Sequence, residues 1–133
     1  NHQFVIESII YQMYQGKSPI KLGDPIPYRD FIFEPDLLSA YTLAALSNNK
    51  KIIGESINIG TGKSVSIKQL AEKIRKITGY TGKIRWNSFP KRALEIPKLE
   101  VDTAKAKKLL KWKPKVTLNE GLNITASYYN NRK

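Results

Sequence analysis

The chain has 133 residues, and its composition, 41% hydrophobic and 26% charged, is ordinary for a folded protein and too apolar for a disordered one. Its length suits a single domain that spans residues 1–133. The absence of cysteine excludes a disulfide framework and a cysteine nucleophile, and the single histidine argues against a zinc site. No apolar run approaches the roughly twenty residues of a membrane helix, so we expect a cytoplasmic protein without membrane contact.

The formal charge of the chain is +12, from 23 basic and 11 acidic residues, and such a charge is one property of nucleic-acid-binding proteins. Most of the basic residues are lysines, and many occupy helix positions that should face solvent, such as Lys68, Lys73 and Lys105. A solvated, lysine-rich surface accounts for this pattern, and no RNA- or DNA-binding motif is visible. We expect no nucleic acid partner and keep a basic nucleic-acid-binding module as the alternative.

The first part of the chain is predicted to alternate helices with short extended segments. Apolar residues recur at helical spacing in residues 4–16, which predicts an amphipathic helix. Residues 19–22 and 28–33 are predicted to be extended on either side of a loop, because the two prolines of residues 23–27 oppose helix. A second helix, with a proline in its first turn, is predicted over residues 35–47 and expected to be more fully buried.

The middle of the chain carries a clear turn signal. Residues 56–59 are predicted to form a short strand, and Gly60 and Gly62 then turn the chain. Ser66 is expected to cap a third helix while Gln69 returns a hydrogen bond to it.

The last part of the chain is predicted to hold a strand, a long loop and two helices. The strand covers residues 83–86, and the loop covers residues 87–99, where periodicity is weak. One final helix is expected to be capped by Asp102 and the other by Thr117, with Glu120 completing its capping box. The sum of these elements is a small α+β domain.

Three sequence phrases carry a family resemblance. They are Arg29-Asp30-Phe31-Ile32, Asn58-Ile59-Gly60-Thr61-Gly62 and Asp102-Thr103-Ala104-Lys105-Ala106, the last of which leads into Leu109-Leu110-Lys111-Trp112-Lys113-Pro114. Together they resemble the C-terminal, substrate-binding half of an extended short-chain dehydrogenase/reductase, the family of nucleotide-sugar epimerases and 4,6-dehydratases. The resemblance implies that the chain is the part of such an enzyme that binds a nucleotide diphosphate sugar.

The same resemblance sets expectations for cofactor and partners. In the intact enzyme, NAD or NADP would be held by a Rossmann half that is absent here, so we expect this fragment to bind no cofactor. The cofactor would oxidise the sugar transiently at C4 and then return the hydride. Apolar surface on this chain is expected to face the missing half. Relatives commonly form homodimers through that half, so a homodimer of the intact enzyme is possible.

The resemblance places substrate contacts at five residues: Leu22, Tyr28, Arg29, Arg92 and Glu95. The two arginines occupy the family's pyrophosphate-binding positions and the glutamate its ribose-binding position. The loop at residues 23–28 is expected to bring Leu22 and an aromatic edge near the nucleotide base, where Tyr28 either stacks on the ligand or packs within the protein. Arginine's planar fork gives phosphate oxygens paired hydrogen bonds, and a carboxylate suits two neighbouring hydroxyl donors. The alternatives are an ion pair for each arginine and a solvent-exposed acid for the glutamate.

Other residues of these motifs are expected to be structural. Asp30 should order its loop or Arg29, and Trp112 should be an anchor for side-chain packing. The Gly60-Thr61-Gly62 phrase lacks the third glycine of a dinucleotide-binding turn, so we interpret it as a tight structural turn. Tyr129 and Lys133 have the spacing of the family's catalytic pair but stand at the C-terminus with no cofactor site before them. We therefore predict no catalytic residue.

The identity of the nucleotide and sugar stays open. The Arg92–Pro97 segment lacks the phrases typical of deoxythymidine-diphosphate-glucose dehydratases and of uridine-diphosphate-galactose epimerases. A guanosine- or cytidine-diphosphate sugar dehydratase, resembling GDP-mannose 4,6-dehydratase, or a less common epimerase is compatible with the motifs. A stand-alone binding or scaffold domain is a further alternative.

Overall fold

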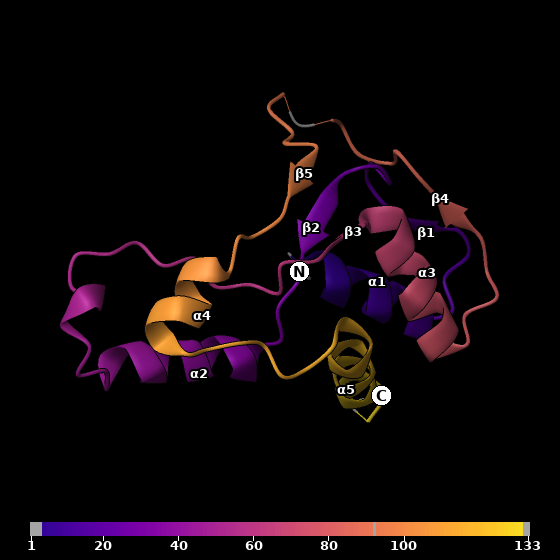
Figure 1. The fold of residues 1–133 in the computed structure, drawn as a ribbon. Coiled ribbons are helices and arrows are strands. Elements are labelled where there is room, and N and C mark those ends of the chain that lie inside the picture. The colour runs from indigo at the N-terminus through magenta and orange to yellow at the C-terminus, as the bar shows by residue number, and fades with distance from the viewer. Residues whose placement is uncertain (1–3, 92, 132–133) are drawn as a thin grey trace.

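Helices are the main regular elements of the molecule. The computed structural model describes residues 4–91 and 93–131. Figure 1 shows two groups of helices, with the short strands at one side of the larger group. The helices are α1 (Val5–Tyr14), α2 (Glu34–Ala45), α3 (Ile67–Thr78), α4 (Ala104–Leu110) and α5 (Leu118–Asn130), together with the short 3₁₀ helix η1 (Lys50–Ile52).

The strands form two small sheets. The first pairs β1 (Ile20–Lys21) in parallel with β4 (Ile84–Arg85). In the second, β2 (Tyr28–Asp30) is central, antiparallel to β3 (Ser64–Ser66) and parallel to β5 (Lys98–Leu99). These helices and short strands confirm the α+β prediction, and they place β2 between segments that are distant in sequence.

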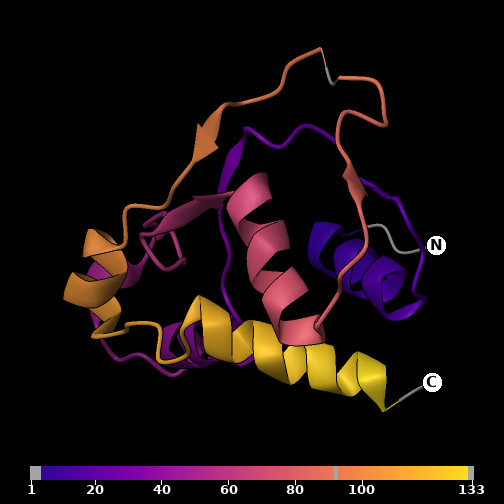
Figure 2. The ribbon, with the colours of Figure 1, turned by 90° about the vertical axis from the view of Figure 1, so that its right-hand side faces the viewer.

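The larger helical group is built from α1, α3 and α5, which lie against one another in both ribbon views (Figures 1 and 2). Each contributes apolar residues at helical spacing to one core, represented by Ile9, Leu70 and Leu122, which are at most 2% exposed. The predicted capping boxes begin two of these helices, at Ser66 for α3 and at Thr117 for α5. Asp102 lies one residue before the cap position of α4, where its carboxylate accepts a hydrogen bond from the Ala104 N–H at 2.8 Å.

The smaller group joins α2 to α4 through a second core of Ala40, Ala106, Leu110 and Trp112. The indole N–H of Trp112 donates to the Ser39 hydroxyl at 2.9 Å, and the ring is 3% exposed, which confirms its structural role.

Buried Asp36 ties this second group to the chain that leads into α5. Its side chain is 4% exposed, and one carboxylate oxygen accepts the backbone N–H groups of Lys115 at 2.9 Å and Val116 at 2.8 Å. The carboxylate also stands in the first turn of α2, where the helix dipole favours negative charge.

Two predictions about this region were wrong. Helix α2 is not fully buried, because only its Asp36 and Ala40 face is covered, while Leu38, Tyr41 and Leu43 are 53%, 60% and 45% exposed. Residues 56–59 form no strand, since no backbone partner lies beside them in the described part of the chain. The first difference leaves apolar surface uncovered on α2, which confirms the prediction of exposed apolar area. Ile57 and Ile59, by contrast, stay half-buried against the second core.

The Asp30 carboxylate holds the turn at Gly60–Gly62 against β2. It accepts hydrogen bonds from the backbone N–H of Thr61 at 3.0 Å and of Gly62 at 2.8 Å, and from the Thr61 hydroxyl. The Val101 N–H lies 3.4 Å from the same carboxylate. This confirms that Asp30 orders a loop and that the glycine phrase is a structural turn.

Gly60 is required by this arrangement because a side chain has no space there. A Cβ atom would lie 2.8 Å from the Val101 side chain and 3.0 Å from an Asp30 oxygen. We predict that Gly60→Ala lowers the free energy of unfolding by about 1–3 kcal/mol through overpacking. Gly23→Ala is the control, since a Cβ there meets nothing within 4 Å. Urea unfolding followed by circular dichroism measures both, and equal stability of the two variants would contradict the account.

Asp36→Ala should also destabilise the fold, because it leaves two backbone N–H donors without their acceptor. We expect a loss of about 1–3 kcal/mol in the free energy of unfolding. Glu34→Ala removes an exposed acid from the same helical turn and should change stability little. A loss of the same size in Glu34→Ala would assign the effect to the helix dipole rather than to the Asp36 hydrogen bonds.

Candidate functional site

The candidate site is centred on Arg29, the middle residue of β2. Its side chain is 22% exposed and its guanidinium is surrounded by acceptors. One nitrogen donates to the carbonyls of Tyr28 at 2.7 Å and Ile96 at 2.9 Å, and the other forms a hydrogen-bonded ion pair with the Glu95 carboxylate. The Arg29 guanidinium is therefore held in place by two backbone carbonyls at one nitrogen and by the Glu95 carboxylate at the other.

Glu95 reaches Arg29 because β5 pairs with β2. The Tyr28 N–H donates to the Pro97 carbonyl at 2.8 Å, and the parallel register then places Lys98 opposite Tyr28 and Leu99 opposite Arg29. Arg29 and Glu95, 66 residues apart in sequence, thus meet side by side. A carboxylate on a guanidinium uses the same planar hydrogen-bonding geometry as a phosphate does.

The other predicted contacts differ in accessibility. Tyr28, the residue before Arg29 on β2, is 38% exposed. Leu22 is 4% exposed within the larger core, and this burial does not support a substrate contact. Its backbone instead fixes the neighbouring loop, because its carbonyl accepts the Ser88 N–H at 2.9 Å. Arg92 lies outside the described residues.

The loop before β5 exposes apolar side chains that the sequence prediction did not assign to the site. Phe89, Leu94 and Ile96 are 58%, 93% and 53% exposed. A surface ion pair between Lys91 and Asp24, at 3.5 Å, joins this loop to the loop before β2. The weak periodicity of the segment was the signal for a loop, but periodicity does not say which apolar residues lie on the surface.

Charged groups next to the site are arranged in local pairs. The pKa of Glu100 is lowered to about 2, chiefly by the hydrogen bond from the Ser64 hydroxyl, then by those from the Lys98 ammonium and the Ser64 N–H. Farther away, the hydrogen bond from Lys105 lowers the pKa of Glu55. Glu100 therefore stays ionised at neutral pH and joins the end of β5 to β3.

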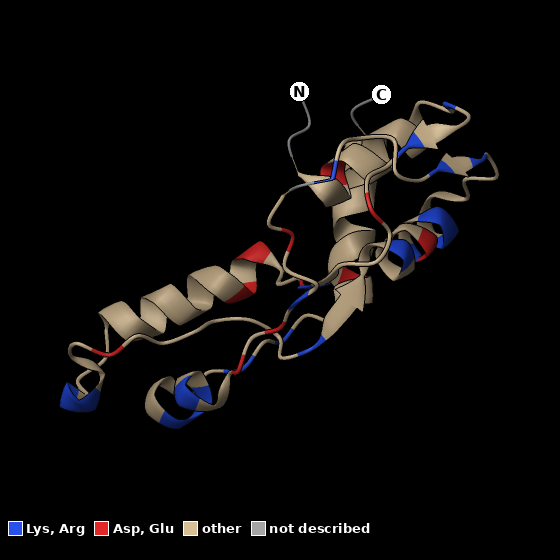
Figure 3. Ribbon diagram, turned by 90° about the horizontal axis from the view of Figure 1, so that it is seen from above, with Lys and Arg blue, Asp and Glu red and all other residues tan. Residues whose placement is uncertain are grey.

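The distribution of positive charge does not favour the nucleic-acid alternative. Figure 3 shows lysine and arginine spread over several elements at both ends of the molecule rather than gathered in one stripe. In residues 4–91 and 93–131, no helix is long and apolar enough to cross a bilayer. The same residues contain no cluster of three or more acidic or histidine side chains suited to a metal ion.

The glycine turn at Gly60–Gly62 does not fit a dinucleotide pyrophosphate. The N–H groups of Thr61 and Gly62, which a phosphate would need, are already donated to Asp30. Tyr129 packs along α5 against the larger core, and Lys133 lies outside the described residues.

Comparison with known proteins gives consistent matches along nearly the whole chain. The model of the GDP-mannose 4,6 dehydratase family matches residues 1–125. A putative UDP-glucose 4-epimerase of Methanocaldococcus jannaschii is 32% identical over 127 residues, which are 96% of this chain and 39% of that protein. A UDP-glucuronate 4-epimerase of Thermodesulfobacterium geofontis is 36% identical over 118 residues, 87% of this chain and 34% of that protein.

Solved structures agree with these sequence matches. The crystal structure of UDP-glucose 4-epimerase with UDP-glucose from Thermotoga maritima superposes with a TM-score of 0.87 at 31% identity, over 99% of this chain and 41% of that one. The chain thus spans about two-fifths of the length of these relatives. From the family match, the conserved fold and the predicted motifs together, the chain belongs to the GDP-mannose 4,6 dehydratase family of extended short-chain dehydrogenases/reductases.

Proposed function

We propose that this chain is the nucleotide-sugar-binding part of an NAD(P)-dependent epimerase or 4,6-dehydratase. The observation that carries the proposal is the meeting of Arg29 and Glu95 from separate segments. Relatives named as UDP-sugar epimerases and GDP-L-fucose synthases support the ligand class.

In this proposal Arg29 binds the diphosphate. The guanidinium is anchored by the carbonyls of Tyr28 and Ile96, so its outward nitrogen has a fixed direction. In the structure that nitrogen donates to the Glu95 carboxylate. When the ligand binds, its diphosphate would replace the carboxylate as the acceptor, because the two anions have similar hydrogen-bonding geometry. The released Glu95 carboxylate then accepts hydrogen bonds from the ribose hydroxyls, while Tyr28 borders the base. Arg92 is proposed as the second phosphate ligand on its motif position alone.

The chain's own contribution to catalysis would be orientation. NAD or NADP, when bound, would supply transient oxidation and reduction at the sugar's C4, and the turn at Gly60–Gly62 does not fit that cofactor. A clamped diphosphate fixes the position of the sugar, and such positioning can lower a reaction barrier by several kcal/mol, in the upper range about 7–11 kcal/mol.

We propose that the cofactor is held by a further domain, and that the exposed apolar side of α2 contacts it. Leu38 and Tyr41, which are three residues apart and so share one face of α2, make an uncovered surface of the kind that marks domain contacts. The intact enzyme is proposed to be cytoplasmic. A homodimer of the intact enzyme is part of the same proposal.

Arg29→Ala should weaken the binding of UDP-glucose or GDP-mannose about ten- to a hundredfold, because it removes charge-assisted hydrogen bonds. Arg29→Lys should restore affinity only in part, since an ammonium lacks the paired donors. Isothermal titration calorimetry measures both. Arg85→Ala removes an equal charge from an exposed position on β4 and should bind as the wild type does. If a folded Arg29→Ala variant binds the nucleotide sugar with wild-type affinity, Arg29 is not part of the binding site.

Glu95→Gln should strengthen the binding of inorganic pyrophosphate about two- to fivefold, because the carboxylate no longer competes for Arg29. Pyrophosphate has no ribose, so the second proposed role of Glu95 does not enter. Glu72→Gln is the matched control, since Glu72 is paired with Arg75 on α3, away from β2. Unchanged or weaker pyrophosphate binding by Glu95→Gln would contradict the proposed exchange.

A further inference from the structure

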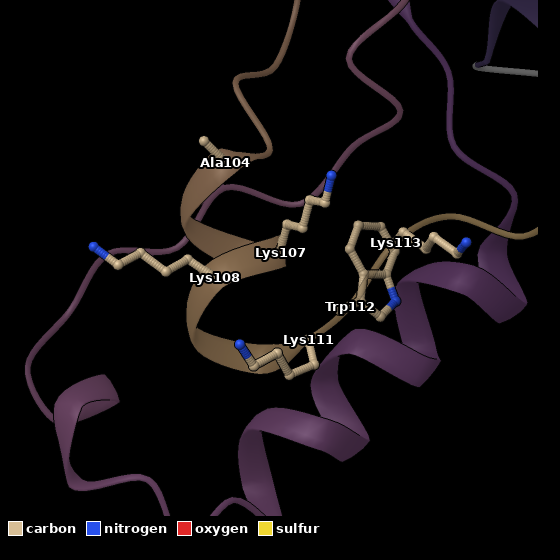
Figure 4. Close-up of a pocket in the computed structure, with 6 residues that line it drawn as sticks. All are labelled: Ala104, Lys107, Lys108, Lys111, Trp112 and Lys113. Carbon is tan, nitrogen blue, oxygen red and sulfur yellow. The ribbon is translucent and has the colours of Figure 1, made fainter.

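A groove on α4 lies apart from Arg29 and is lined mainly by lysine. It has a volume of about 570 Å³ and is lined by Ala104, Lys107, Lys108, Lys111, Trp112 and Lys113 (Figure 4). No acidic residue is among these lining residues. The groove therefore combines positive charge with the carbon surface of an exposed alanine and of long lysine stems, while the Trp112 ring lies behind them at 3% exposure.

The groove is built on a fixed backbone. Helix α4 is anchored by Ala106 and Leu110, which are 0% and 8% exposed in the smaller core. The helix ends at Lys111, whose φ of 54° is left-handed, and the Trp112 ring behind it is fixed by the hydrogen bond to Ser39. Asn49 also donates to the Leu109 carbonyl at 3.1 Å, which holds the last turn of the helix. The backbone that carries the four lysines is therefore held in place by packing and hydrogen bonds.

The positive charge of the groove is not neutralised within the described part of the chain. Lys105, on the same helix, is paired with Glu55 at 2.8 Å, but no such ion pair involves the four lining lysines. The helix dipole favours cations at Lys107 and Lys108 in the last turn. Lys111 and Lys113 lie beyond that turn, so the helix dipole explains the presence of lysine at only two of the four positions.

Figure 4 shows that the four ammonium groups point in different directions around the groove rather than toward one point. A single phosphate therefore cannot contact them together. An extended partner that carries several separated carboxylates can, and its apolar side chains would cover the carbon surface between the lysines. Charge complementarity thus selects an acidic segment.

Other partners match the groove less well. A second copy of this chain carries the same +12 charge and would be repelled. Single-stranded nucleic acid is held by stacking on exposed aromatic faces, but Trp112 is 3% exposed and no other aromatic residue lines the groove. A bilayer surface is flat, whereas this surface is hollowed.

We propose that the α4 groove, lined by Lys107, Lys108, Lys111 and Lys113, is a docking surface for an acidic peptide segment with interspersed apolar residues. The surface is independent of nucleotide-sugar binding, because none of its lining residues contacts Arg29 or Glu95.

The test is fluorescence anisotropy of the full chain with a dye-labelled peptide of glutamates and leucines. The groove variant is K107Q/K111Q/K113Q, and the matched control is K68Q/K76Q/K83Q, which removes the same charge from exposed positions outside the groove. We expect the groove variant to lose affinity about tenfold, as for three exposed ion pairs, and the control variant to bind like the wild type. Replacing glutamates by glutamine, or leucines by serine, in the peptide should weaken binding.

Equal affinity of the wild type and the groove variant would overturn the proposal. An equal loss in both variants would overturn it as well, because binding would then follow net charge alone. A single-stranded oligonucleotide and phosphatidylserine vesicles serve as competing probes. If either binds more tightly than the peptide and depends on the same three lysines, the occupant is not an acidic peptide and the proposal fails.

Discussion

The carboxylate of Asp30 is the interaction on which the rest of the structure depends. It joins β2 to the turn at Thr61 and Gly62, and it lies near the Val101 N–H that follows β5. Segments that are far apart in sequence are thereby held at one point, between the two helical groups. Because Arg29 directly precedes Asp30, the hydrogen bonds that fix the turn also fix the strand that carries the proposed phosphate ligand.

The two helical groups have different degrees of burial, and this difference has a physical cause. Three helices cover one another in the larger group, whereas α2 is covered on one face, where Ala40 packs with α4 and Trp112 and with half-buried residues such as Ile52 and Ile57. Leu38, Tyr41 and Leu43 consequently remain exposed. In the proposed function, a further domain covers this surface of α2.

The sequence predicted most of the fold where local rules decide the structure. The capping boxes at Ser66 and Thr117 and the turn at Gly60–Gly62 were correct, because side-chain capping and glycine turns are set within a few residues. The strand at residues 56–59 and the burial of α2 were wrong, since both depend on what lies beside them. Tertiary neighbours, which a local pattern does not contain, decided these two elements.

The candidate site was predicted in part, and only through family motifs. The motifs assigned Arg29 and Glu95 to the site, and these two side chains are in contact in the structure. They also assigned Leu22, which is buried. No local sequence pattern predicts a contact between residues that are far apart in the chain. A crystal structure of the chain with UDP-glucose tests the central claim most directly. The account predicts diphosphate oxygens about 2.7–2.9 Å from the Arg29 guanidinium, with Glu95 moved onto the ribose. A diphosphate bound elsewhere, with the Arg29–Glu95 ion pair intact, would contradict it.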